Sequence, residues 1–162
     1  MGGSERYHLM TLEINDLAPE FTLADQNNNQ ITLSHLKGKK VLLYFYPKAD
    51  TPGCTKQTCL LNDHLGQFNQ LDVTVVGVSP DKVEKQKKFA DKYGIEFSLL
   101  SDEDHAVAEL YSVWGEKKMY GRAYMGIIRS AFLIDEQGEI TETWYKVSPK
   151  DTVVKVLKAL SN

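Results

Sequence analysis

Three short segments of the chain are almost continuously apolar, and they define the expected framework. They read VLLYFY at 41–46, VTVVGVS at 73–79 and FSLLSD at 97–102. Short apolar runs of this kind are typical of strands that are buried on both faces of a sheet. Polar segments with helical periodicity lie between them. The first two thirds of the chain therefore predict strands that alternate with helices.

Helices are predicted wherever apolar residues recur at helical spacing. The expected ranges are about 53–71, 80–93, 102–115 and 148–162. Ser79 and Pro80 are the expected N-cap and first residue of the second helix, since serine is favoured at the N-cap and proline at the first helical position. Ser101 or Asp102 is the residue through which the chain is expected to enter the third helix.

Two antiparallel hairpins are expected at the ends of this alternating region. FTLAD and QITL flank an asparagine-rich turn at 26–30, and RSAFLID and EITETWY flank a turn at 135–138. The segment 115–128 shows no clear period and is expected to be irregular. The pattern predicts an α/β fold: a central mixed β-sheet flanked by helices on both faces, with an N-terminal β-hairpin.

Length and charge narrow the possible functions. We expect residues 10–162 to form a single domain, and residues 1–9 to be an N-terminal tail or a cloning remnant. The formal net charge of −3 argues against nucleic-acid binding, and no apolar stretch is long enough for a membrane-spanning helix. Without a signal-peptide pattern, and with two cysteines in all, we expect a cytoplasmic protein.

Both cysteines lie in one short stretch, PKADTPGCTKQTCLL, at 47–61. Cys54 follows Thr51, Pro52 and Gly53 and should occupy the first turn of the helix that follows a buried strand. Unpaired amides and the positive end of the helix dipole favour a thiolate there. A polar, turn-rich surrounding is unusual for a cysteine that merely fills a core, so the context indicates a reactive thiol.

Cys59 stands five residues further along the same predicted helix. Five residues at standard helical geometry separate the two thiols by about 7.5 Å along the axis and about 140° around it. A disulfide tolerates a Cα–Cα distance of up to about 7 Å, so this pair could close only if the helix unwinds. From this spacing alone, Cys59 is either a partner in a catalyst that changes shape or an ordinary core residue.

Other arrangements of the thiols fit less well. A thioredoxin-type dithiol requires C-x-x-C, whereas the spacing here is C-x-x-x-x-C. A zinc site recruiting His64 would have ligands that fan around the helix and lacks a further ligand pair, so no metal is expected. None of the four scattered histidines is placed for a cysteine–histidine pair. Arg129, one of three arginines, begins a buried strand and is either a thiolate-activating group or an exposed edge residue.

The segment PKADTPGCT matches the P-x-x-x-T-x-x-C motif of the peroxiredoxins. The chain resembles the bacterioferritin-comigratory protein, or peroxiredoxin Q, branch of that family in three segments: YFYPKADTPGCTKQTC, LLSDEDHAVAELYSVWGEKK and GIIRSAFLID. The likeness runs from about residue 17 to the last helix. The resemblance implies a thioredoxin-like fold. It also implies a thiol peroxidase of the atypical two-cysteine type, without metal or other cofactor.

The resemblance also assigns roles to residues. Cys54 would attack the hydroperoxide and become a sulfenic acid. Cys59 would resolve it as an intramolecular disulfide, which thioredoxin or a similar dithiol donor would reduce. Thr51 would hydrogen-bond the thiolate and the peroxide, Arg129 would activate the thiolate, and Pro47 would shield the pocket.

Expectations for substrate contacts and assembly follow from the same resemblance. Gly53 and Pro52 would contact the substrate, and Tyr124 would line its entrance. A monomer is expected, with a weak dimer as the alternative. The sequence departs from the branch at Asn62, where many relatives carry an arginine, which bears on how easily the helix unwinds.

A non-catalytic alternative is also compatible with the fold and the thiols. The chain could be a thioredoxin-fold interaction module, such as a holdase, whose cysteines only sense redox state. A disulfide reductase is disfavoured because C-x-x-C is missing. Consumption of hydroperoxide distinguishes the peroxidase from both.

Overall fold

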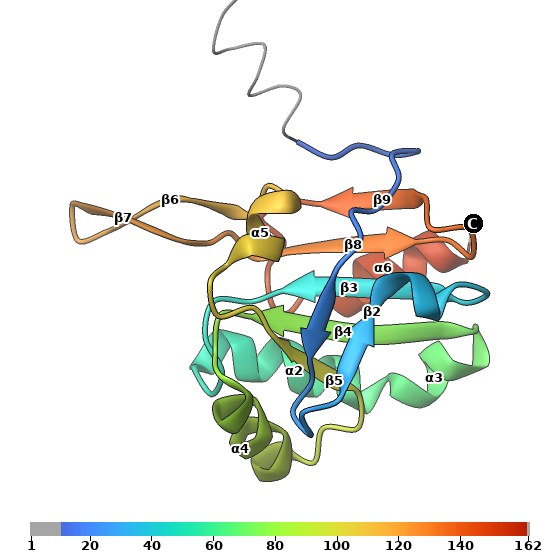
Figure 1. The fold of residues 1–162 in the computed structure, drawn as a ribbon, viewed down its shortest axis with the longest axis horizontal. Coiled ribbons are helices and arrows are strands. Elements are labelled where there is room, and N and C mark those ends of the chain that lie inside the picture. The colour runs from blue at the N-terminus through green and yellow to red at the C-terminus, as the bar shows by residue number, and fades with distance from the viewer. Residues whose placement is uncertain (1–10, 162) are drawn as a thin grey trace, which may run out of the picture.

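The computed structural model describes residues 11–161, so the predicted tail at 1–9 lies outside the described residues. Seven strands form one mixed sheet in the order β2-β1-β5-β4-β3-β8-β9 (Figure 1). These strands are β1 Thr22–Ala24, β2 Gln30–Thr32, β3 Lys40–Phe45, β4 Val73–Ser79, β5 Ser98–Ser101, β8 Ser130–Ile134 and β9 Ile140–Trp144. The three predicted buried strands and both predicted hairpins are confirmed.

Strand β3 lies inside the sheet, between β4 and β8, and its two faces point into two hydrophobic cores. It pairs in parallel with β4 and antiparallel with β8. Leu42 and Tyr44 point into one core, whereas Val41 and Leu43 point into the other, as the two-residue period of a strand requires. Because both faces are covered, β3 has no polar face, which explains its continuous apolar run.

Helices cover both faces of the sheet, as predicted. Their bounds are η1 Leu33–Leu36, α2 Pro52–Asp63, α3 Leu65–Gln70, α4 Val83–Tyr93, α5 Ala106–Leu110 and α6 Thr152–Leu160. Buried residues of α2, α3, α4 and α6 belong to the core that contains Leu42, and residues of η1 and α5 belong to the other. The predicted fold class is therefore confirmed.

Several predicted helix bounds were wrong. The helix expected over 53–71 is two helices that meet at His64, whose ring nitrogen Nδ1 lies 2.8 Å from the carbonyl oxygen of Leu60. Helix α4 begins at Val83 instead of residue 80, because Ser79 is still part of β4 and its hydroxyl donates to Asp81.

The third helix is also shorter than predicted. Helix α5 covers Ala106–Leu110, although the carboxylate of Asp102 does accept hydrogen bonds from the amides of Val107 and Ala108. Neither Ser101 nor Asp102 is the N-cap, because the chain makes a turn after Asp102 and His105 precedes the first helical residue. In that turn His105 adopts a left-handed conformation with φ of 51°.

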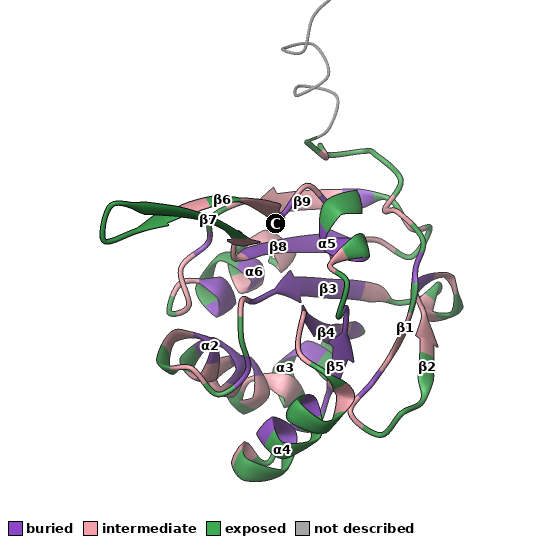
Figure 2. Cartoon of the chain, turned by 60° about the vertical axis from the view of Figure 1, so that its left-hand side comes forward, coloured by how far each residue is buried: buried purple, intermediate pink, exposed green. Residues whose placement is uncertain are grey.

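The prediction that 115–128 is irregular was wrong. These residues form a second sheet of two antiparallel strands, β6 Trp114–Met119 and β7 Arg122–Ile127. Tyr120 and Gly121 connect them with φ values of 52° and 77°, as a two-residue type I′ turn requires. The hairpin projects beyond the main sheet and is largely exposed (Figure 2). Neither of its faces is buried, so it lacks the alternation that would have predicted strands.

Candidate active site

Cys54 lies where β3 gives way to α2. The strand ends at Phe45, the chain crosses a short loop, and α2 begins at Pro52 with Thr51 as its N-cap. Cys54 is therefore in the first helical turn, as predicted, and its side chain is buried. The first amides of a helix have no intrahelical partner, so this turn presents hydrogen-bond donors and the positive end of the helix dipole.

Arg129 approaches the same sulfur from the neighbouring strand. Register between β3 and β8 pairs Phe45 with Ser130, which sets the residue before β8 beside the end of β3. The guanidinium Nη2 of Arg129 donates to Cys54 Sγ at 3.3 Å. A fixed cation at hydrogen-bond distance stabilises a thiolate relative to a thiol. The structure thus brings together two side chains that lie 75 positions apart in the sequence.

Gln57 fixes the direction of the guanidinium. Its Oε1 accepts a hydrogen bond from Arg129 Nη1 at 2.8 Å, and its Nε2 donates to Thr152 Oγ1 at 2.9 Å. The Gln57 side chain is fully buried. The sequence analysis did not identify Gln57. The signal in the sequence was a polar residue one helical turn after Cys54, on the face of α2 that packs against the core.

Thr51 and the loop before it are held by their own hydrogen bonds. The Thr51 hydroxyl donates to the carbonyl oxygen of Lys48 at 2.7 Å, which leaves its oxygen available as an acceptor. The amide of Ala49 donates to Asp81 Oδ2 at 2.7 Å. No hydrogen bond joins the side chains of Thr51 and Cys54 within residues 11–161. The Thr51 oxygen can therefore accept a hydrogen bond from a bound molecule.

Gly53 lies against the Arg129 guanidinium, whereas Pro47 and Pro52 precede Cys54 in the chain. A Cβ at Gly53 would lie 3.2 Å from Arg129 Nη2 and 3.4 Å from Pro149 Cγ, so a larger residue would crowd the guanidinium. Pro47 is half-buried after the end of β3, and Pro52 is exposed. Both flank the loop that carries Thr51.

Tyr124 lies on the projecting hairpin. Its side chain is 42 % exposed, and it pairs across the hairpin with Lys117. No hydrogen bond among the described residues links Tyr124 to the thiol. Within the part of the chain that the structure describes, Tyr124 is therefore not connected to the thiol.

Cys59 lies on the same helix as Cys54 and is partly buried. Both thiols are free, and the intact helix of α2 separates their Cα atoms by about 9 Å at standard helical geometry. Burial raises the pKa of the Cys59 thiol, and the nearby negative charge of Asp63 raises it further. In this conformation Cys59 is held as a thiol, beyond disulfide distance from Cys54.

The match to known proteins decides the family. The model of the AhpC/TSA family matches residues 14–143. The chain belongs to the AhpC/TSA family. It is 45% identical over 153 residues to "Peroxiredoxin Bcp" of Bacillus subtilis (strain 168), covering 94% of this chain and 98% of the relative. It is 48% identical over 145 residues to "Peroxiredoxin Bcp" of Escherichia coli (strain K12), covering 88% and 93%.

Solved structures of peroxiredoxins share the fold. The bacterioferritin comigratory protein of Xanthomonas campestris superposes with a TM-score of 0.82 at 36% identity, covering 87% of this chain and 90% of that one. A cysteine-to-serine mutant of Xylella fastidiosa PrxQ superposes with a TM-score of 0.87 at 35% identity, covering 93% of this chain and 96% of that one. The resemblance to the peroxiredoxin Q branch is thereby confirmed, as is the thioredoxin-like fold of these enzymes.

Lys117 is a second cation near the thiol of this peroxiredoxin. Burial lowers the pKa of Lys117, and the charge of Arg129 lowers it further, whereas a negative charge on Cys54 acts in the opposite direction. Its ammonium group donates to the carbonyl oxygen of Ile127 at 2.8 Å, at the base of the hairpin. Sequence analysis missed Lys117 because the hairpin that positions it was not predicted.

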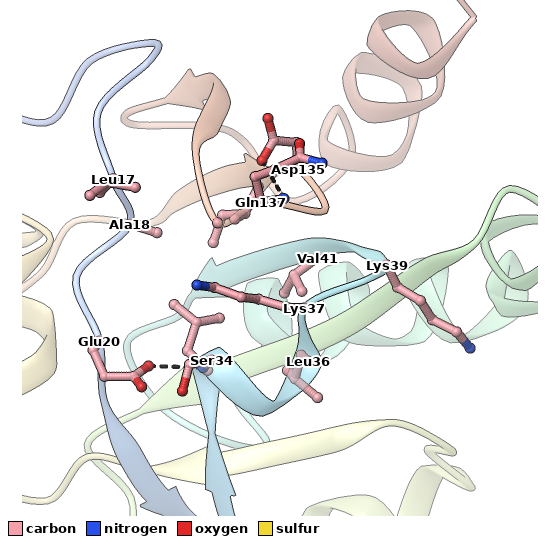
Figure 3. A pocket seen from close by; sticks show the side chains of 13 residues that line it. Leu17, Ala18, Glu20, Ser34, Leu36, Lys37, Lys39, Val41, Asp135 and Gln137 are labelled. Carbon is pink, nitrogen blue, oxygen red and sulfur yellow. Dashed lines mark hydrogen bonds between the residues drawn. The ribbon is translucent and has the colours of Figure 1, made fainter.

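A separate apolar hollow lies at the opposite end of the sheet (Figure 3). Its volume is about 200 Å³, and its walls include Leu33, Val41 and Ile134. Val41 is near the start of β3 and Ile134 ends β8, whereas Cys54 follows the end of β3. This hollow is therefore distinct from the peroxidatic site of the family.

The described residues contain neither a metal-binding cluster nor a membrane-spanning helix. Within residues 11–161, no cluster of three or more histidine, cysteine, aspartate or glutamate side chains could hold a metal ion. In the same range, no helix is long and apolar enough to cross a membrane.

Proposed function

We propose that this protein is a thiol peroxidase that reduces hydroperoxides through Cys54, with Cys59 as the resolving cysteine and thioredoxin or a similar dithiol as the reductant. The observation that carries the proposal is the contact at 3.3 Å between Arg129 Nη2 and Cys54 Sγ, in the first turn of α2. Family membership supports the same reaction. We further propose that the protein acts as a monomer in the cytoplasm.

The first step is a displacement on oxygen. The Cys54 thiolate attacks the terminal oxygen of the hydroperoxide, an S–O bond forms and the O–O bond breaks. Negative charge develops on the departing oxygen, which takes up a proton and leaves as water or alcohol. Donors that already point at this charge lower the barrier, because they need no reorganisation during the reaction.

The residues around Cys54 supply these donors and an acceptor. The Arg129 guanidinium stabilises the thiolate and aligns the O–O bond, and the amides of Gly53 and Cys54 add donors that the helix does not use. Because the Thr51 hydroxyl donates to the carbonyl oxygen of Lys48, its oxygen is free to accept a hydrogen bond from the O–H group of the hydroperoxide. The ring of Pro47 shields the pocket from water, and Gly53 and Pro52 contact the substrate.

The second step requires α2 to unwind. The Cys59 sulfur loses its proton and attacks the Cys54 sulfenic acid, so that an S–S bond forms, the S–O bond breaks and water leaves. The reductant then attacks this disulfide and restores both thiols. Tyr124, on the exposed hairpin, contributes to the entrance for larger hydroperoxides.

Peroxidase assays with thioredoxin and its reductase test the proposal. Cys54→Ser should abolish hydroperoxide consumption, whereas Cys59→Ser should complete one turnover and then stop with thioredoxin as reductant. Continued turnover by Cys54→Ser would refute the assignment. If the wild-type protein consumed no hydroperoxide, the holdase alternative would replace it.

A further inference from the structure

Asn62 ties the last turn of α2 to the segment that follows α4. Its Nδ2 donates to the carbonyl oxygen of Gly94 at 3.0 Å, and its Oδ1 accepts from the amide of Glu96 at 2.8 Å. Gly94 ends α4 in a left-handed conformation with φ of 65°, which exposes these backbone groups. The side-chain amide of Asn62 thus bonds to two backbone groups that would otherwise bond to water.

The beginning of α2 is held by the same segment. Asp50 directly precedes the N-cap Thr51, and its Oδ1 accepts from the Tyr93 hydroxyl at 2.7 Å. Its Oδ2 accepts from Lys92 Nζ at 3.0 Å. Residues 92–96, named the α4 clamp here, therefore bond to Asn62 in the last turn of α2 and to Asp50, two residues before its first turn.

Unwinding between the cysteines would also release the end of the helix. In an α-helix each amide bonds to the carbonyl four residues before it. The carbonyls of residues 54–59 therefore hold the amides of residues 58–63. Once 54–59 leave the helical conformation, Asn62 loses its backbone support, so its bonds to the α4 clamp oppose the change together with the other contacts of α2.

We propose that the α4 clamp sets the rate of disulfide formation, with Asn62 and Tyr93 as positioning residues that keep Cys59 away from Cys54. The inference rests on the proposed function, since it concerns the resolving step of the same reaction. In that step the Cys59 sulfur bonds to the Cys54 sulfur, the S–O bond of the sulfenic acid breaks, and hydroxide leaves with a proton as water.

The clamp also sets how much enzyme is lost to further oxidation. While α2 stays wound, the sulfenic acid of Cys54 can react with a second hydroperoxide, which becomes water or alcohol as the sulfur becomes a sulfinic acid. Resolution by Cys59 competes with this reaction. A weaker clamp should speed resolution and so make the enzyme more resistant to excess hydroperoxide.

Variants at the two ends of α2 test the clamp. Asn62→Ala removes two hydrogen bonds and should raise the rate of disulfide formation about tenfold, whereas Tyr93→Phe removes one and should raise it about threefold. Asn62→Asp keeps the acceptor for Glu96 and should give an intermediate rate. Asn69→Ala is the matched control, because Asn69 is exposed on the neighbouring α3.

Two measurements separate the steps. Stopped-flow mixing with hydrogen peroxide gives the rate of Cys54 oxidation, which should be the same in all these proteins. Acid quench, alkylation and mass spectrometry then give the rate at which the Cys59 thiol disappears. In parallel, the reduction potential of Asn62→Ala should fall by about 30 mV, the equivalent of a tenfold change for a two-electron couple.

The outcomes distinguish this inference from the proposed function. If hydrogen peroxide left wild-type Cys54 unoxidised, the proposed function itself would fail. If Cys54 were oxidised normally but Asn62→Ala matched wild type in rate and potential, only the clamp would be wrong. An effect confined to one of the two ends of α2 would equally contradict a clamp that acts at both.

Discussion

Replacing Gln57 by leucine would leave the Arg129 guanidinium without the oxygen that now holds its Nη1. Leucine fills a similar volume in this fully buried position, so the substitution changes hydrogen bonding more than packing. Arg129 would be free to turn away from Cys54. The reaction of Cys54 with hydroperoxide should therefore slow down, although no atom that contacts the sulfur has been removed.

The size of the effect follows from the two bonds that are lost. A hydrogen bond to a charged group contributes about 1.5–3 kcal/mol to folding. Thr152 loses its bond to Gln57 but still donates to the carbonyl of Ser148 at 2.9 Å, so losing the bond to Thr152 costs less free energy than losing the bond to Arg129. At about 2–4 °C per kcal/mol for a chain of this size, Tm should fall by about 3–12 °C. A loss of about 1.4 kcal/mol at the transition state would slow Cys54 oxidation about tenfold.

Stopped-flow oxidation of reduced protein by hydrogen peroxide measures this rate directly. Gln26→Leu is the matched control, since Gln26 donates to the carbonyl of Phe97 and accepts from the amide of Leu99, and makes no hydrogen bond to Cys54 or Arg129 within the described chain. It should lower Tm but leave the rate of Cys54 oxidation unchanged. Equal rates for wild type and Gln57→Leu would refute the role given to Gln57.

Three further predictions test other parts of the structure. Arg129→Lys should slow Cys54 oxidation at least about tenfold in stopped flow, since one ammonium group cannot make both of the guanidinium's bonds; an unchanged rate would contradict the geometry. Asp63→Asn should move the pH profile of disulfide formation to lower pH, because a negative charge that raises the pKa of Cys59 is gone; an unmoved profile would exclude that influence. Gly77→Ala should cost about 1–3 kcal/mol in urea unfolding, since its Cβ would lie 2.8 Å from the Tyr44 ring, and an unaltered midpoint would show that the ring can shift.

Much of the framework could be predicted because its causes are local. The run at 41–46 indicated a strand with two buried faces, and β3 has them. The turn-rich collar before Cys54 indicated a helix start, and α2 begins at Pro52. The pairing of Arg129 with Cys54 required more than periodicity. It was proposed through the family motif, and the structure explains it by the register of β3 with β8.

The contacts that hold the site in place could not be read from local patterns. Gln57 contacts Arg129 and Thr152, which are distant in the sequence, and Asn62 bonds to backbone groups that only the left-handed turn at Gly94 exposes. The hairpin at 115–128 was missed because neither of its faces is buried. Residues placed by such contacts become visible only once the fold is known.

Thiol counting and intact mass after one equivalent of hydrogen peroxide test the central claim most directly. The reduced protein should lose both thiols and the mass of two hydrogen atoms, and thioredoxin should restore both. Cys59→Ser should instead gain the mass of one oxygen atom at Cys54. If wild-type protein kept two free thiols and its original mass, then Cys54 would not be a peroxidatic cysteine and the account would be wrong.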